Sequence, residues 1–170
     1  MSLEHLWAGW RLDYVQRAGA EERAGAPGEC VFCRIAASGP PSADNGVVWR
    51  DERVFVVLNA YPYASGHLLV LPVRHVGDLH ELDPAESAAM WGATLDAMAA
   101  LGAAYDPDGM NMGANLGRAA GAGIPRHVHL HVVPRWSGDT NFMTTVGGVR
   151  VLPEALAQSW EKLEGAWPAR

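Results

Sequence analysis

Three histidines alternate with apolar residues in the run from His127 to Val133, the part of the chain best suited to chemistry. Side chains alternate across a β-strand, so a strand here places His127, His129 and His131 on one face. Their backbone positions are then ~7 Å apart, too far for a single atom to bind all three rings easily. A neutral imidazole is also a good nucleophile toward phosphorus near neutral pH. The pattern therefore favours a division of tasks among the histidines, with nucleophilic catalysis as one of them.

Two other interpretations of this run stay open from the residues alone. The histidines can be ordinary side chains on a solvated edge strand, or they can form a His-x-His metal site. A glycine-rich loop, Gly117–Gly123, lies just before the predicted strand. Backbone N–H groups at glycines such as Gly121 and Gly123 can approach an anion closely, which favours a phosphate cradle.

Cys30 and Cys33 form a Cys-x₂-Cys pair and are the only cysteines in the chain. Two thiolates need two further ligands to complete a tetrahedral zinc site, and the histidines can provide them. A redox pair is the competing interpretation, but such a pair usually starts a helix in a βαβ unit, which the sequence does not indicate. The simplest interpretation is two ordinary buried thiols.

Hydrophobic alternation and turn residues predict the strands that must carry these residues. They are expected at 47–49, 54–58, 67–73, 110–116 and 127–133, with the first two joined as a hairpin. Antiparallel strands with isolated helices indicate an α+β fold in a single domain, built on an antiparallel sheet with one long central helix and a C-terminal helix.

The central helix is expected to begin after Asp83, because Pro84 suits its first turn and Glu86 completes a capping box. Trp91, Leu95 and Met98 share one face at helical spacing, and Gly102 is expected to end the helix. The C-terminal helix is expected to open at Pro153, and its shared apolar face is formed by Leu156, Trp160 and Leu163.

The composition of the chain argues against nucleic acid and membrane as partners. The chain has 170 residues, 49% of them hydrophobic, with a formal net charge of -6, which argues against broad nucleic-acid binding. No apolar run approaches the ~20 residues of a membrane span, and the first residues do not resemble a secretory signal. With only one close cysteine pair, a cytoplasmic location is expected. Residues 1–28 are expected to form an arm and linker, and residues 29–170 the catalytic domain.

The run His127–Val133 resembles the signature of the histidine triad family, in which three histidines alternate with apolar residues. Other matching segments follow the family's order and spacing: Leu58-Asn59, Gly66–Pro72, Gly109–Asn111 and Asn115–Gly117. This resemblance covers residues 30–136. Residues 6–14, 61–63, 134–142 and 147–148 are similar to one branch, which contains bacterial diadenosine tetraphosphate phosphorylases and ATP adenylyltransferase-like proteins.

The resemblance implies roles for individual residues. His129 would attack the α-phosphorus of an AMP-containing nucleotide and form a nucleotidyl-histidine. His131 would hold phosphate oxygens, and His67 would support the phosphate site. Asn59 would bind ribose hydroxyls, and Asn115 would donate a hydrogen bond near the phosphate or the leaving group.

The resemblance also implies a structural zinc bound by Cys30, Cys33, His75 and His127, with no organic cofactor. Members of the family are usually homodimers, and a larger homo-oligomer stays open here. In one respect the chain departs from its relatives, which commonly carry a serine in the glycine-rich loop, where this chain has Gly121-Ala122-Gly123. The choice between water and phosphate as acceptor is therefore left open.

Three functions follow as expectations. The first is a phosphorylase or hydrolase of diadenosine polyphosphates. The second is a hydrolase of adenylyl phosphoramidates, which would use the same nucleophile. The third is a protein that binds nucleotides without catalysis.

Overall fold

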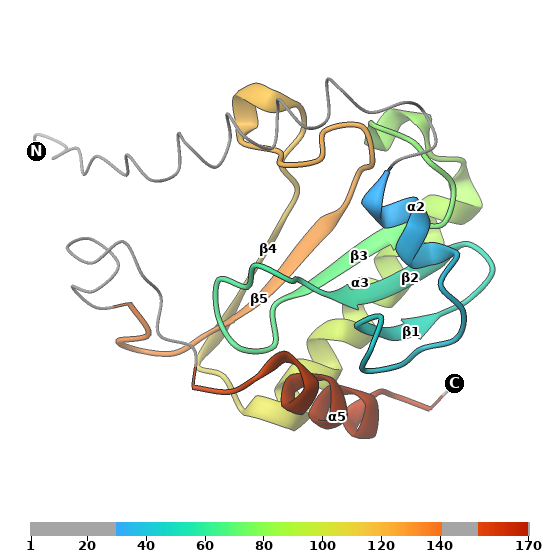
Figure 1. Ribbon diagram of the computed structural model, residues 1–170. Coiled ribbons are helices and arrows are strands. Elements are labelled where there is room, and N and C mark those ends of the chain that lie inside the picture. Colours follow the sequence, from blue (N-terminus) through green and yellow to red (C-terminus); the bar gives the residue numbers. More distant parts are fainter. Residues whose placement is uncertain (1–29, 141–152, 170) are drawn as a thin grey trace, which may run out of the picture.

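The computed structural model describes residues 30–140 and 153–169, which form an α+β domain around a five-stranded antiparallel sheet (Figure 1). The sheet order is β1-β2-β3-β5-β4. The strands are β1 (Val47–Arg50), β2 (Val54–Leu58), β3 (Leu68–Pro72), β4 (Gly109–Gly113) and β5 (Leu130–Arg135). The helices are α2 (Val31–Ala36), α3 (Pro84–Tyr105) and α5 (Leu156–Ala166), with 3-10 turns η1 (Leu79–Glu81) and η2 (Arg118–Ala120). The predicted fold class and the hairpin of β1 and β2 are confirmed.

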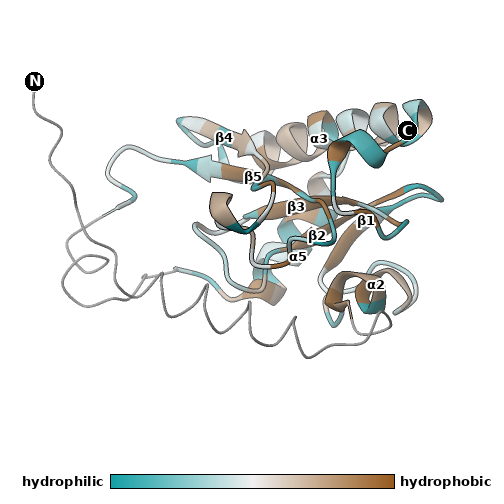
Figure 2. Ribbon diagram, turned by 90° about the horizontal axis from the view of Figure 1, so that it is seen from above, coloured by the Kyte–Doolittle hydropathy of each residue, from teal (hydrophilic) through white to brown (hydrophobic). Residues whose placement is uncertain are grey.

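Helices cover both faces of the sheet (Figure 2). Helix α2 packs on one face, where Phe32 joins buried side chains such as Phe55 and Leu71. Helices α3 and α5 pack on the other face, where Leu101 and Leu163 are fully buried. Because side chains alternate along each strand, β1, β2 and β3 contribute to both clusters, whereas β5 contributes Val132 to the cluster under α3 and α5.

Helix α3 starts as predicted and ends later. The Asp83 side chain accepts a hydrogen bond from the Glu86 N–H at 2.8 Å, and the Glu86 carboxylate accepts one from the Asp83 N–H at 3.0 Å. Gly102 was expected to end the helix, but the chain stays helical to Tyr105 and terminates at Asp106, whose φ of 44° is left-handed. A single glycine costs a helix only about 1 kcal/mol, which packing on the sheet offsets.

The face of α3 that carries Trp91 and Leu95 is not the buried one. These side chains are 53% and 49% exposed, whereas Ala93, Ala97 and Ala100 are fully buried against the sheet. Small side chains allow the helix to lie close to the sheet. The face that carries the alanines is therefore the buried one, and the face that carries the larger Trp91 and Leu95 is not.

Other elements also differ from the sequence-based expectations, among them β4, which was expected to reach residue 116 and ends at Gly113. Helix α2, directly after Cys30, was not predicted. Helix α5 begins at Leu156 rather than Pro153, with the Gln158 side chain accepting a hydrogen bond from the Ala155 N–H. Residues 127–129 precede β5 instead of belonging to it.

Proline explains the late start of β5. The ladder pairs Leu68 with Val132 and Val70 with Leu130, so its continuation would place Pro72 opposite Val128. Proline has no N–H to donate to a ladder. The Val128 N–H instead donates to the Val76 carbonyl at 2.7 Å, and residues 127–129 run beside the end of β3 without forming a strand.

Within residues 30–140 and 153–169, no helix combines the length and apolar character needed to span a bilayer. The aromatic arm at 6–14 and the matching positions at 141–142 and 147–148 lie outside the described residues.

Candidate active site and metal centre

His67 and His131 form a hydrogen-bonded pair whose proton positions follow from the backbone. The Tyr63 N–H donates to His67 Nδ1 at 3.0 Å, so this nitrogen carries a lone pair. His67 Nε2 therefore bears the proton and donates to His131 Nδ1, 3.0 Å away. His131 in turn carries its proton on Nε2, a buried atom with no hydrogen-bond partner among the described residues. The pair thus ends in an N–H donor available to an acceptor such as a phosphate oxygen.

His129 has the complementary arrangement. Its Nδ1 lies 2.9 Å from the His127 carbonyl oxygen, which can only accept, so Nδ1 donates and Nε2 keeps a lone pair. Burial lowers the pKa of His129, which favours the neutral ring. The His129 and His131 ring centroids are 5.0 Å apart. A nucleophilic nitrogen and a hydrogen-bond donor therefore belong to neighbouring rings.

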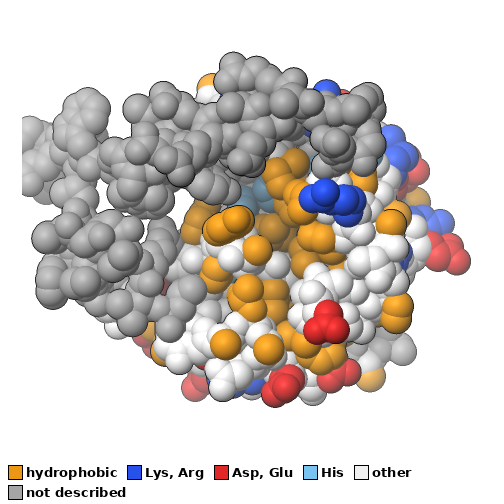
Figure 3. Space-filling model, viewed as in Figure 1, with side chains coloured by type: hydrophobic (Ala, Val, Ile, Leu, Met, Phe, Trp, Pro, Cys, Tyr) orange, Lys and Arg blue, Asp and Glu red, His pale blue; other side chains and the backbone are white. Residues whose placement is uncertain are grey.

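Aromatic side chains hold these imidazoles in place. The Phe32 ring packs against His127 and His129 at centroid distances of 5.6 and 5.1 Å. Tyr63 stacks on His131 with an interplanar angle of 15°. Figure 3 shows histidine atoms reaching the surface between hydrophobic side chains. Neither aromatic residue is among the site residues predicted from the sequence: Phe32 lies between the two cysteines, and Tyr63 belongs to residues 61–63, which gave only a similarity to one branch of the family.

The His127 side chain points toward the cysteines and away from the hydrogen-bonded pair of His67 and His131. Its Nε2 donates to the Pro72 carbonyl at 2.9 Å, so Nδ1 carries the lone pair. That Nδ1 lies 3.4 Å from Cys30 Sγ and 3.6 Å from Cys33 Sγ. His75 Nδ1 lies 3.2 Å from Cys33 Sγ. All four candidate ligand atoms lie within 4.8 Å of one another.

These separations fit a zinc ion. With Zn–S of about 2.3 Å and Zn–N of about 2.0–2.1 Å, tetrahedral geometry separates sulfur from nitrogen by about 3.6 Å. The observed sulfur–nitrogen distances of 3.2 to 3.6 Å agree with this value. Two thiolates and two imidazoles form a donor set typical of structural zinc. The four residues predicted as ligands therefore form a possible metal-binding cluster.

The redox interpretation is only partly consistent with the structure. Cys30 does cap a helix, contrary to the expectation that none starts here. However, the described strands form an antiparallel sheet, and among residues 30–140 and 153–169 no βαβ unit includes α2. Burial and the neighbouring Cys30 raise the pKa of Cys33 to about 11, whereas reactive thiols have lowered values.

The predicted nucleotide-binding residues lie around the histidine pair or on the preceding loop. Asn59 Nδ2 lies 3.3 Å from His67 Nδ1, and Asn59 Oδ1 accepts a hydrogen bond from the Tyr61 N–H. Asn115 is half-buried on the segment between β4 and η2. Gly121 and Gly123 lie between η2 and β5, and Gly121 has a left-handed φ of 85° that suits glycine.

We expect His131 to make stability depend on pH. Burial, and secondarily the charge of His129, lowers the pKa of His131 from 6.5 to about 4. Between these values the unfolded chain binds a proton that the folded protein does not, so stability falls as pH drops from 6.5 toward 4. In urea unfolding at pH 6.5 and 5, His131→Gln should lose less stability than wild type. Exposed His80 provides the control: His80→Gln should keep the wild-type loss, and an unchanged loss in His131→Gln would contradict the expectation.

Comparison with known proteins gives a consistent family assignment. The family model of the HIT domain matches residues 41–138. The chain is 38% identical over 169 residues to the AP-4-A phosphorylase of Mycobacterium tuberculosis, covering 97% of this chain and 85% of that protein. It is 31% identical over 113 residues to Protein hit of Bacillus subtilis, covering 66% of this chain and 75% of that protein.

Solved structures agree with these sequence relatives. A zinc-bound histidine triad family protein from Mycobacterium smegmatis superposes with a TM-score of 0.65 at 32% identity, covering 81% of this chain and 92% of the other. A hypothetical histidine triad nucleotide-binding protein from Sulfolobus tokodaii gives a TM-score of 0.66 at 26% identity, with coverage of 81% and 91%.

Proposed function

Since the chain belongs to the HIT domain family, we propose that it cleaves nucleotide phosphoanhydrides, with diadenosine polyphosphates as substrates and His129 as the nucleophile. The similarity to an AP-4-A phosphorylase over nearly the whole chain supports this substrate class. The observation that carries the mechanism is the hydrogen bond between His129 Nδ1 and the His127 carbonyl, which leaves the Nε2 lone pair free.

The reaction has two balanced steps. In the first, His129 Nε2 attacks the α-phosphorus, a P–N bond forms, and the P–O bond to the leaving polyphosphate breaks. His131 Nε2–H donates a hydrogen bond to the phosphoryl oxygens as charge develops. In the second, an oxygen of phosphate or water attacks the same phosphorus, the P–N bond breaks to restore the lone pair on His129, and the proton of the attacking group is released to solvent.

Product analysis tests this proposal. The protein is incubated with diadenosine tetraphosphate, with and without inorganic phosphate. ADP and ATP formed only with phosphate indicate phosphorolysis, whereas AMP and ATP formed without it indicate hydrolysis. Turnover of an adenylyl phosphoramidate alone would replace this function by the second one considered, and AMP binding without any turnover would leave a nucleotide-binding protein.

Zinc bound by Cys30, Cys33, His75 and His127 completes the proposal as a structural element. The ion would tie α2 to the segment before β5, and through Phe32 it would support the ring of His129. We assign residues 29–170 to the catalytic domain and residues 1–28 to an arm, with a cytoplasmic location.

A homodimer is the proposed assembly. Among the described strands β4 lies at an edge of the sheet, and edge strands present backbone groups that can pair with a second copy. Met112 on β4 is 45% exposed, and the exposed Trp91 and Leu95 add apolar surface on α3. A two-fold pairing of β4 with itself would use the same surface on both chains.

Charged substitutions test this assembly. Met112→Lys and Trp91→Glu should each shift the protein from dimer toward monomer in sedimentation equilibrium, because a charge at an edge or interface disfavours pairing. Leu156→Lys, at a 42% exposed position on α5, is the matched control and should leave the mass unchanged. Wild-type mass in both interface variants would contradict the proposed surface.

A further inference from the structure

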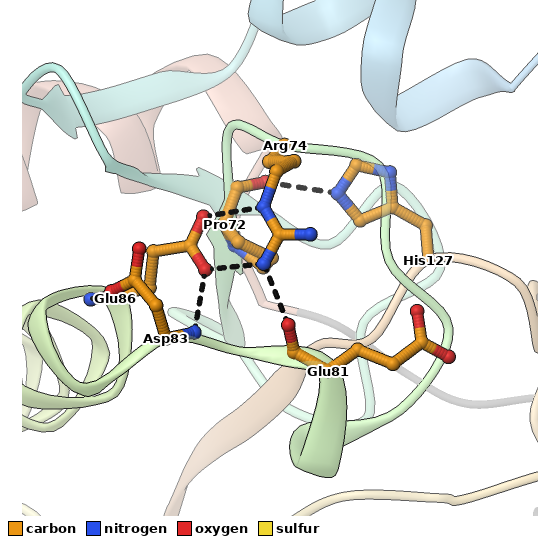
Figure 4. A network of polar contacts seen from close by, with 6 residues as sticks. All are labelled: Pro72, Arg74, Glu81, Asp83, Glu86 and His127. Carbon is orange, nitrogen blue, oxygen red and sulfur yellow. Dashed lines mark hydrogen bonds and ion pairs between the residues drawn. The ribbon is translucent and has the colours of Figure 1, made fainter.

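An ion pair outside the metal centre joins the segment that carries His75 to the start of α3 (Figure 4). Arg74 Nε donates to Glu86 Oε1 at 2.8 Å, and Nη2 donates to Glu86 Oε2 at 2.6 Å. The same Nη2 also donates to the Glu81 carbonyl at 2.7 Å. The paired planar geometry of guanidinium and carboxylate fixes orientation as well as distance.

Glu86 is a rigid anchor for this pair. It is 6% exposed and occupies the third position of the α3 capping box, bonded to the Asp83 N–H. Its hydrogen bonds to Arg74 lower its pKa to about 2. Arg74, in contrast, keeps a half-exposed side chain. The arginine is therefore held by a carboxylate whose own position is set by the helix.

Of the four candidate ligands, His75 has the least support from its own surroundings. His127 is fully buried, and Cys30 and Cys33 are part-buried at the start of α2. His75 is exposed, and it lies after the end of β3 in a segment without regular structure. An exposed side chain on irregular backbone needs ties elsewhere to keep its direction.

Hydrogen bonds to three other parts of the chain hold residues 73–76, the segment that carries His75. The Val73 N–H donates to the Arg53 carbonyl, and the Val76 carbonyl accepts from the Val128 N–H, each at 2.7 Å. Arg74, immediately before His75, supplies the third tie, to α3. Two residues earlier, the Pro72 carbonyl accepts from His127 Nε2 and thereby directs His127 Nδ1 toward the cysteines.

We propose that Arg74 and Glu86 are positioning residues that preorganise His75 and the Pro72 carbonyl for metal binding. This inference rests on the proposed zinc centre and deepens it. The pair contributes no ligand atom to the proposed centre and sets the affinity of the site. Residues that orient metal ligands from outside typically change metal affinity about 10- to 100-fold when altered.

Zinc affinity is the direct test, measured for zinc alone by competition with a chromophoric chelator on the full chain. Arg74→Met keeps the apolar part of the side chain and removes the guanidinium group. The dissociation constant of this variant for zinc should rise about 10- to 100-fold. Glu86→Gln should do the same, because glutamine can still complete the capping box but not the ion pair. Arg74→Lys should recover only part of the affinity, because lysine lacks the planar fork.

Two controls separate positioning from general stability. Asp83→Ala removes the helix cap and should leave zinc affinity within about twofold of wild type. Arg135→Met removes the ion pair with Asp139, which lies away from the centre, and should also leave affinity unchanged. Circular dichroism verifies that each variant is folded at the assay temperature.

The outcomes distinguish this inference from the zinc centre itself. Wild-type affinity in Arg74→Met and Glu86→Gln would overturn the positioning role while leaving zinc binding intact. A loss in Asp83→Ala as large as in Arg74→Met would also overturn it, because helix stability alone would then explain the effect. A wild-type protein that binds no zinc would overturn the metal centre and this inference together, with turnover of diadenosine tetraphosphate still testable separately.

Discussion

Replacing His129 by glutamine is expected to lower kcat on diadenosine tetraphosphate by about 10⁴-fold or more, because the nucleophile itself is removed. The amide of glutamine can still donate to the His127 carbonyl, so the fold is expected to persist with a loss of about 1–2 kcal/mol. Release of ADP, AMP and ATP measures turnover, and urea unfolding measures stability.

Intermediate trapping makes this result specific to the nucleophile. Wild-type protein quenched during turnover should carry one adenylyl group per active chain, detected by mass spectrometry, and His129→Gln should carry none. His80→Gln, at an exposed position on η1, should retain both turnover and the adenylyl group. Normal turnover in His129→Gln would refute the assigned nucleophile, and an adenylyl group mapped to another residue would relocate the chemistry.

The sequence correctly predicted those helix and strand bounds that depend on residues adjacent in the chain. Strand β2 has the predicted bounds because five apolar residues lie between polar turns, and the start of α3 follows from Asp83 and Glu86. The end of α3 and the start of β5 depend on tertiary partners. Gly102 is held in a helix by packing, and the proline at position 72 interrupts a ladder formed by distant segments.

The candidate site shows the same division. Alternation places His131 and Val132 on opposite faces, and the predicted metal ligands do lie together. The proton positions were beyond sequence reasoning, because they depend on the Tyr63 N–H and the His127 carbonyl. The ion pair between Arg74 and Glu86 was not predicted from the sequence either, because the capping box already gave Glu86 a role.

Removal of zinc is expected to destabilise the protein strongly. At a zinc concentration about 1,000 times the dissociation constant, binding contributes about 4 kcal/mol, which corresponds to a fall in Tm of roughly 8–16 °C for a chain of this size. Cys33→Ser should lose the ion, because a serine hydroxyl does not replace a thiolate ligand. Elemental analysis should give one zinc per wild-type chain and none in the variant, and thermal unfolding should show the lower Tm.

A chelator provides the decisive comparison, because its effect should depend on the intact ligand set. It should lower the Tm of wild type toward that of Cys33→Ser and leave the variant unchanged, since both treatments remove the same ion. A reductant should change neither Tm if Cys30 and Cys33 serve as metal ligands. If wild-type protein contains no zinc, does not respond to chelator, and instead shifts its Tm with reductant, the two thiols form a disulfide pair and the ligand assignment is wrong.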